Sequence, residues 1–287
     1  MFAIFKRELR AYFLTPIGYL YMGLFLLLSG IFFTFNNLLA GRSQFTGFLG
    51  SLLSIFLFAI PLLTMRLFSE EKRQKTDQLL LTSPVSIAGI VCGKFLAAFA
   101  VFCATLLVTV SYALIIAVYG DLETWETLGS YIGFLFLGAS YISVGIFISA
   151  ITENQISAAL LSFFVLMLIW LLDPISQMLP SDIRSGIISA LLLLAALLFF
   201  LHFNTRNRFI VLAAALLGAT VIGGFYLFNP GIFSGFVHNI LSWFSLNRRY
   251  QPFSMGLLRF DSLLYYASFS GFLLFLTVRL IEKRRWN

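Results

Sequence analysis

The stretch RLFSEEKRQKTDQLLLTSPVSIAGIVCGK, residues 66–94, is the longest charged interruption in an otherwise apolar chain. Seven charged residues lie between Arg66 and Asp77, and three consecutive leucines follow at 79–81. A run of charges usually predicts a solvated loop. Three consecutive leucines would be unfavourable in a loop that faces only water, however, so we expect the bilayer edge or a partner protein to cover them. The stretch therefore predicts a short helical elbow at the water boundary, between two membrane spans.

The second half of this stretch predicts a break and then a new helix. Ser83 precedes Pro84, and the residue before a proline is pushed away from helical geometry. Ser86 can cap a helix that runs apolar as far as Tyr119.

Composition sets the class of the protein. Hydrophobic residues make up 60% of the chain and charged residues 11%, against about 25% charged in an average soluble domain. Runs long enough to cross a bilayer recur along the sequence. The prediction is an all-α polytopic membrane protein, a single transmembrane domain over residues 1–287. Cys92 and Cys103 lie in one apolar segment, so a disulfide framework is not indicated.

Residues 1–13 predict an amphipathic helix in the membrane interface. Aromatic and leucine side chains recur at helical spacing, with basic residues between them. A signal peptide is the competing interpretation. It is the weaker one, because basic and apolar residues are interleaved and no clear small-residue cleavage site follows.

Eight apolar runs are candidate spans, at about 17–35, 48–65, 95–119, 128–151, 156–172, 186–201, 209–228 and 263–278. We expect loops at 36–47 and 173–184, and a longer extracytoplasmic segment at 229–262. The fourth run carries small residues at spacings of four and seven (Gly129, Gly133, Gly138, Gly145 and Ser149). These either allow helix backbones to approach closely or reflect the ordinary tolerance of membrane helices for glycine.

The distribution of positive charge predicts the topology. With both termini cytoplasmic, fourteen of the nineteen Lys and Arg residues fall on the cytoplasmic side, as the positive-inside rule requires. This explains the net charge of +7 without a nucleic acid partner. Two basic termini require an even number of spans. Six spans is the alternative to eight, with residues 186–228 forming a hairpin that does not fully cross.

The sequence lacks the residue patterns of several functional classes. The eight runs contain no acidic or basic side chain in their interiors, which disfavours an ion-coupled secondary transporter. Residues 89–95, GIVCGKF, lack the spacing and the final Ser or Thr of a phosphate-binding loop. His202 and His238 fall in different loops. We therefore expect no catalytic residue, metal site or cofactor in this chain, and ATP hydrolysis would need a separate subunit.

The elbow, with LLLTSP followed by Gly93-Lys94-Phe95, resembles the first cytoplasmic loop of ABC-2 type permeases. The turn at residues 153–159, ENQISAA, is similar to the turn between the fourth and fifth spans of that family. The carboxy-terminal segment from Asp261 to Trp286 resembles the gliding-motility-associated branch. The family commonly has glycine before the elbow threonine, where this chain has Lys75. Family permeases typically have six spans, so residues 186–228 look like an added hairpin.

This resemblance implies the permease subunit of an ATP-driven exporter in a bacterial cell membrane. Two permease copies, identical or related, would pair in the membrane above two ABC ATPase subunits. An accessory membrane protein of the gliding-motility type is a further possible partner. The elbow would hold the coupling helix that receives the ATPase, and the turn at 153–155 would make a smaller contact. The expected docking residues are Gln74, Lys75, Thr76, Asp77, Gln78, Leu79, Leu80, Leu81, Thr82, Glu153, Asn154 and Gln155.

A membrane scaffold or assembly factor that recruits partners but transports nothing is the alternative function. Finding an ATPase gene beside this one would separate the two hypotheses.

Overall fold

The computed structural model describes residues 1–41, 43–76, 85–205, 208–228 and 230–286, and every element that it assigns there is helical. Eight helices in these ranges are long and apolar enough to cross a membrane. They cover residues 16–39, 46–73, 87–119, 124–151, 155–178, 183–205, 208–228 and 260–284. The predicted fold class, an all-α chain with about eight candidate spans, is confirmed.

The chain divides into two compact units, and the first comprises residues 1–169 and 249–287. It begins with α1 (Phe2–Leu14) and α2 (Pro16–Phe33), and α2 continues into a π-helical turn, η1 (Thr34–Leu39). The second span is built from α3 (Thr46–Leu52), η2 (Leu53–Ile55) and α4 (Phe56–Thr64), and α5 (Arg66–Arg73) follows directly. The unit is completed by α7 (Ile87–Tyr119), α8 (Thr124–Ile151), most of α9 (Gln155–Met178), η4 (Arg248–Tyr250), α13 (Gln251–Ser254) and α14 (Phe260–Trp286).

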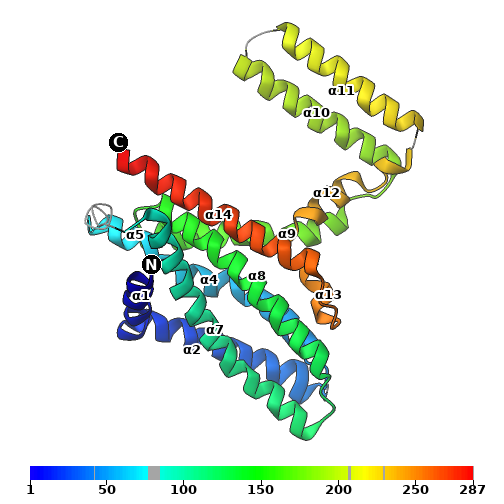
Figure 1. The fold of residues 1–287 in the computed structure, drawn as a ribbon. Helices are drawn as coiled ribbons and strands as arrows, with labels where there is room; N and C mark the ends of the chain where they lie inside the picture. The colour runs from blue at the N-terminus through cyan, green and yellow to red at the C-terminus, as the bar shows by residue number, and fades with distance from the viewer. Residues whose placement is uncertain (42, 77–84, 206–207, 229, 287) are drawn as a thin grey trace. The chain divides into compact units, whose positions relative to one another are not determined.

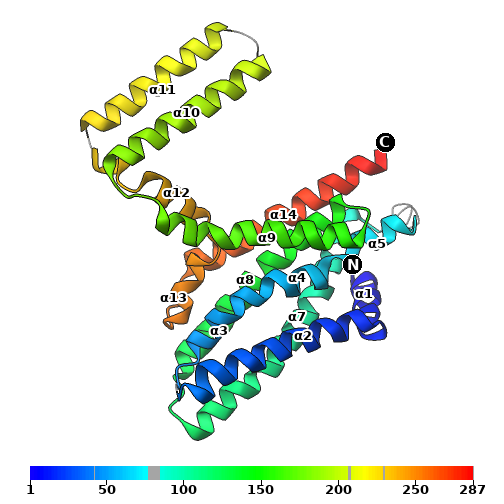
Figure 2. The same ribbon diagram turned by 180° about the vertical axis from the view of Figure 1, so that it is seen from behind.

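Helix α8 is the centre of this first unit (Figures 1 and 2). It contacts α3, α4, α5, α7, α13 and α14, and 72% of its most apolar window is buried, the highest share among the eight candidate spans. The glycines of α8 allow these contacts. A Cβ built on Gly145 would collide with Thr64 of α4, and one on Gly133 would lie 2.6 Å from the ring of Phe253. The spacing of small residues therefore reflects close helix approach.

The second unit, residues 170–248, contains the end of α9 and two long helices, α10 (Ile183–Thr205) and α11 (Arg208–Phe228). These pack on each other where Leu194 meets Gly218. The short helices η3 (Pro230–Phe233) and α12 (Phe236–Phe244) follow. Both Leu192 and Leu216 are well exposed, as expected of a hairpin that depends on lipid or on a partner for cover.

Some predicted boundaries were wrong, among them the following two. The loop expected to begin at residue 173 begins later, because α9 continues through Pro174 to Met178. Apolar surroundings favour a backbone that satisfies its own hydrogen bonds, and membrane helices tolerate proline. The third span, expected from about residue 95, begins earlier, because it is continuous with the helix that starts at Ile87. Ser86 caps α7 as predicted, accepting a hydrogen bond from the Gly89 N–H at 3.2 Å.

Candidate coupling site at the elbow

Helix α5 continues from the second span and presents one face to the protein. Leu67, Phe68 and Ser69 are buried, whereas Arg73 at its end is exposed. Helix α5 therefore has a buried face that packs on the protein, and it ends in an exposed charged side chain.

The centre of the site is the Lys94 cluster, which consists of Arg7, Glu8, Glu71 and Lys94. The Lys94 Nζ lies 2.9 Å from a Glu71 carboxylate oxygen and 3.2 Å from one of Glu8. Arg7 is 2.7 Å from that same Glu71 oxygen and 2.5 Å from Glu8. The Lys94 side chain is 1% exposed and that of Arg7 is 51% exposed. Two cations and two carboxylates thus join α1, α5 and α7.

Further groups complete the environment of Lys94. Its ammonium donates to the Leu67 carbonyl at 2.5 Å and lies 4.9 Å from the centre of the Phe68 ring. A buried cation is tolerated only when it is paired and hydrogen-bonded, and these contacts meet that condition. They also fix α5 against the first two turns of α7.

The charges in the cluster shift the pKa values of its two α1 residues, Arg7 and Glu8. Burial alone would raise the pKa of Glu8, but the charges of Lys94 and Arg7 outweigh it, so the pKa of that carboxyl is lowered. Partial burial would lower the pKa of Arg7, but its bonds to Glu8 and the charge of Glu71 raise it overall. Both groups are therefore held in their charged forms.

Helix α1 is fastened to the same place by three other contacts. The Tyr12 hydroxyl donates to the Leu63 carbonyl at 2.6 Å, and Arg66 donates to the Thr15 hydroxyl at 2.8 Å. Gly93 of α7 lets α1 approach, since a Cβ there would lie 3.1 Å from both the Met1 carbonyl and Ile4. Helix α1 is thus part of the site as well as an amphipathic surface helix.

On the other side, α5 is joined to the end of α8. The Lys72 ammonium donates to the carbonyls of Ala150 and Thr152. The Ser149 hydroxyl accepts from the Phe68 N–H at 3.1 Å and donates to the Met65 carbonyl at 3.1 Å. Helix ends leave carbonyls without intrahelical partners, and a cation is favoured at a helix carboxyl terminus. The end of α8 and the elbow are therefore one connected structure.

Of the predicted docking residues in the elbow, Gln74, Lys75 and Thr76 are described and all three are exposed. Asp77, Gln78, Leu79, Leu80, Leu81 and Thr82 lie outside the described residues. The Thr76 N–H donates to the Glu71 carbonyl at 2.9 Å, which closes α5. Lys75 has a φ of 56°, in the left-handed region that glycine adopts most easily. The backbone at this position thus has the geometry for which glycine is best suited.

The second predicted contact, Glu153 to Gln155, lies where α8 passes into α9, and Gln155 is the first residue of α9. Glu153 and Asn154 are exposed, and the Asn154 side chain accepts from the Ile156 N–H at 2.9 Å, as a helix cap does. Lys72 links α5 to this turn through Thr152, and Arg284 of α14 donates to the Ile151 carbonyl at 3.4 Å. The described parts of both predicted contacts therefore belong to one structural region.

Lys94 is a core residue that the sequence pattern did not identify, because it lies just before the predicted third span and its carboxylate partners are distant in the sequence. The periodicity contained the signal, because Ile87, Ile90, Val91 and Ala97 are buried on the face of α7 that includes Lys94.

These features define a class of protein: a polytopic membrane domain whose spans meet a charged helical elbow. Residues 34–281 match the family described as ABC-2 family transporter protein. The match covers most of the chain, so the chain belongs to this family of transporter membrane proteins. No curated protein matches the chain at a significant level.

Proposed function

We propose that this chain is the membrane-spanning permease subunit of an ATP-driven exporter. Separate ATPase subunits hydrolyse ATP and dock on the cytoplasmic elbow, and both chain termini lie in the cytoplasm of a bacterial cell. Two permease copies, identical or related, pair in the membrane. Membership of the ABC-2 family supports an ATPase partner in general. The outward direction, the bacterial membrane and the gliding-motility branch with its accessory membrane protein rest on resemblance.

The observation that carries the proposal is the attachment of α5, the base of the elbow, to the neighbouring helices. Helix α5 is tied to α1 and α7 through the Lys94 cluster and to α8 through Lys72 and Ser149. A force applied to residues 74–82 would act on α5, and the ion pairs and hydrogen bonds of α5 would pass its movement to α1, α7 and α8. Such a base suits a joint that transmits the motion of an ATPase into the spans.

The proposal is tested by co-expressing the tagged chain with an ABC ATPase encoded beside it and measuring capture and ATP turnover. Leu80→Asp places a carboxylate in the expected apolar pocket of the ATPase, where it loses hydration and gains no partner, at a cost of several kcal/mol. We expect capture and turnover above the ATPase's own rate to be lost, while membrane insertion stays normal.

Arg73→Ala is the matched control, because Arg73 is exposed at the end of α5 and an exposed ion pair is worth about 0–1 kcal/mol. It should retain both capture and turnover. A Leu80→Asp chain that inserts normally and still holds a fully active ATPase would overturn the proposed dock. A chain that never inserts would show instead that the leucine serves the fold.

A further inference from the structure

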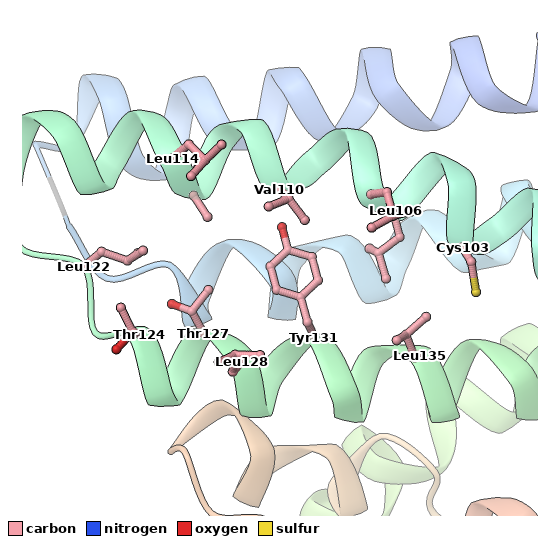
Figure 3. A pocket seen from close by; sticks show the side chains of 12 residues that line it. Cys103, Leu106, Val110, Leu114, Leu122, Thr124, Thr127, Leu128, Tyr131 and Leu135 are labelled. Atoms are coloured by element: carbon pink, nitrogen blue, oxygen red, sulfur yellow. The ribbon is translucent and has the colours of Figure 1, made fainter.

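A cavity of about 450 Å³ lies between α7 and α8, in the half of these helices away from the elbow (Figure 3). Its walls are almost wholly hydrocarbon, from Leu106, Val110 and Leu114 on α7 and from Leu128 and Leu135 on α8. Tyr131 points from α8 toward α7 (Figure 3), and its hydroxyl pairs with Thr109 at 3.2 Å. Since this hydroxyl already has a partner, the cavity offers an occupant apolar contact.

The cavity extends along α7. On α7 its lining runs from Cys103 to Leu114, which is about 16 Å at the helical rise of 1.5 Å per residue. One leaflet of a bilayer contributes about 15 Å of hydrocarbon, half of a core about 30 Å thick. The length of the cavity therefore matches a single extended alkyl chain from one leaflet.

One end of the cavity reaches the water boundary. Leu122, in the loop between the two helices, lines that end, and Cys103 lines the other (Figure 3). Trp125 is 81% exposed beside the loop, and tryptophan is enriched where a membrane meets water. An occupant would thus enter from the interface and extend inward toward Cys103.

The rim at this end is acidic. Asp121 and Glu123, on either side of Leu122, are exposed, and Lys and Arg are absent from residues 95–183. An anionic head group would meet like charges here, whereas an amine would meet opposite ones.

We propose that this cavity binds one alkyl chain of an amphiphile whose head group is cationic or neutral. The chain lies between α7 and α8, and the head group rests at Asp121 and Glu123. The hydrocarbon lining selects the chain, and the rim selects against negative charge.

The test uses two probes of equal length, dodecylamine and dodecanoic acid, each with a photoreactive diazirine near the end of the chain. The purified full-length protein is placed in phosphatidylcholine nanodiscs, illuminated and digested, and labelled peptides are identified by mass spectrometry. We expect the amine to label α7 near Cys103 and α8 near Leu135, with saturation. The acid should label about fivefold less, because one charge near a membrane surface is worth about 1 kcal/mol.

Val110→Trp fills the cavity and should abolish this labelling. Val108→Trp is its matched control, because Val108 lies two residues away on the same helix, is 51% exposed and does not line the cavity. It should label as the unaltered protein does. The double variant Asp121→Asn, Glu123→Gln alters the rim alone, and should equalise the two probes while preserving labelling by each.

Labelling that does not saturate, or that falls equally in both tryptophan variants, would show ordinary annular lipid and overturn the proposal. A second copy of the chain would be shown to cover the cavity by two results together: no labelling of the unaltered protein, and dissociation of the Val110→Trp variant into single copies. An amine preference that persists in the rim variant would contradict the assigned head-group position, and this test holds even if Val110→Trp does not fold.

Discussion

The charged side chains at the base of the elbow include one cation that water hardly reaches. Lys94 is 1% exposed and is held by two carboxylates, a carbonyl and an aromatic ring. Removing one partner from a buried ion pair costs more than the pair contributes, because the other charge is left unpaired in a poorly solvated place. Lys94 is therefore the residue on which the order of the elbow base depends most.

We predict that Lys94→Met destabilises the protein by about 3–5 kcal/mol, since Glu8 and Glu71 lose their buried partner. Arg7→Met removes a cation from the same two carboxylates, but the Arg7 side chain is 51% exposed, so about 0–1 kcal/mol is expected. Thermal unfolding in detergent measures both. Equal losses in the two variants would contradict the central role given to Lys94.

The lowered pKa of Glu8 makes part of the stability depend on pH. Desolvation opposes ionisation, but Lys94 and Arg7 favour it more strongly, so the pKa falls below its ordinary value of 4.5. A carboxyl with a lowered folded-state pKa stabilises the protein above its unfolded pKa, and this stabilisation is lost as pH falls through the folded value.

We therefore predict that the unfolding temperature of Glu8→Gln lies below that of the unaltered protein at pH 7. The difference should persist down to about pH 4.5 and shrink at lower pH. Melting curves of the two proteins from pH 7 to pH 3 check this. The difference between their unfolding temperatures at each pH removes the contribution of the other carboxylates, which titrate in both proteins. A difference that stays constant across this range would contradict the pairing of Glu8.

At the scale of whole helices, close approach depends on the absence of side chains at particular positions. Gly145 of α8 faces Thr64 of α4 so closely that a Cβ would collide with its hydroxyl, whereas no atom lies within 4 Å of a Cβ built on Gly271 of α14. One substitution should therefore have opposite effects in these two membrane helices.

We predict that Gly145→Ala destabilises the protein by about 1–3 kcal/mol through overpacking. Gly271→Ala should be neutral or stabilising by about 0.5–1 kcal/mol, because alanine favours the helical backbone where space allows it. Thermal unfolding of the two variants in the same detergent gives the comparison. Destabilisation of similar size at both positions would show that the packing of α8 on α4 is looser than described.

The sequence predicted the elements well and their ends less well. Apolar runs identified the eight helices, because about 20 apolar residues are required to cross a bilayer. The same criterion ended the fifth run at Asp173-Pro174, although α9 continues to Met178. A polar residue and a proline in a short window do not show whether the backbone N–H and C=O groups keep their helical hydrogen bonds. Likewise, α14 extends to Trp286 through the basic residues of the carboxyl terminus.

The candidate site was predictable only in part. The charge run and the leucines located the elbow, because both features lie within one continuous stretch of sequence. The pairing of Lys94 with Glu8 joins residues that are 86 positions apart, and no local pattern specifies it. It becomes visible only when α1 packs against α7.

For the whole molecule, the topology decides which surfaces an ATPase can reach. Eight crossings place Thr205 in the cytoplasm and Glu123 outside the cell, whereas a six-span chain with a hairpin that does not cross would place both outside. The basic elbow and termini favour the cytoplasmic assignment of these segments.

We predict that a single cysteine at Glu123 reacts with an impermeant thiol reagent in intact cells, and that one at Thr205 reacts only after permeabilisation. Both are tested in a background without Cys92 and Cys103, and both positions are exposed. Reaction at both sites in intact cells would support six spans. Reaction at Thr205 alone would contradict the orientation itself.

The central claim, that an ATPase docks at the elbow, is tested most directly by cross-linking. Single cysteines at Thr76 in the elbow and at Asn154 in the α8–α9 turn occupy exposed positions, and one at Thr124 lies at the opposite end of α8. Membranes containing the chain and its ATPase are treated with a short bifunctional reagent that joins this thiol to ATPase amines. We predict cross-links to the ATPase from 76 and 154, and none from 124. Cross-linking from 124 but not from 76 would contradict the proposed dock.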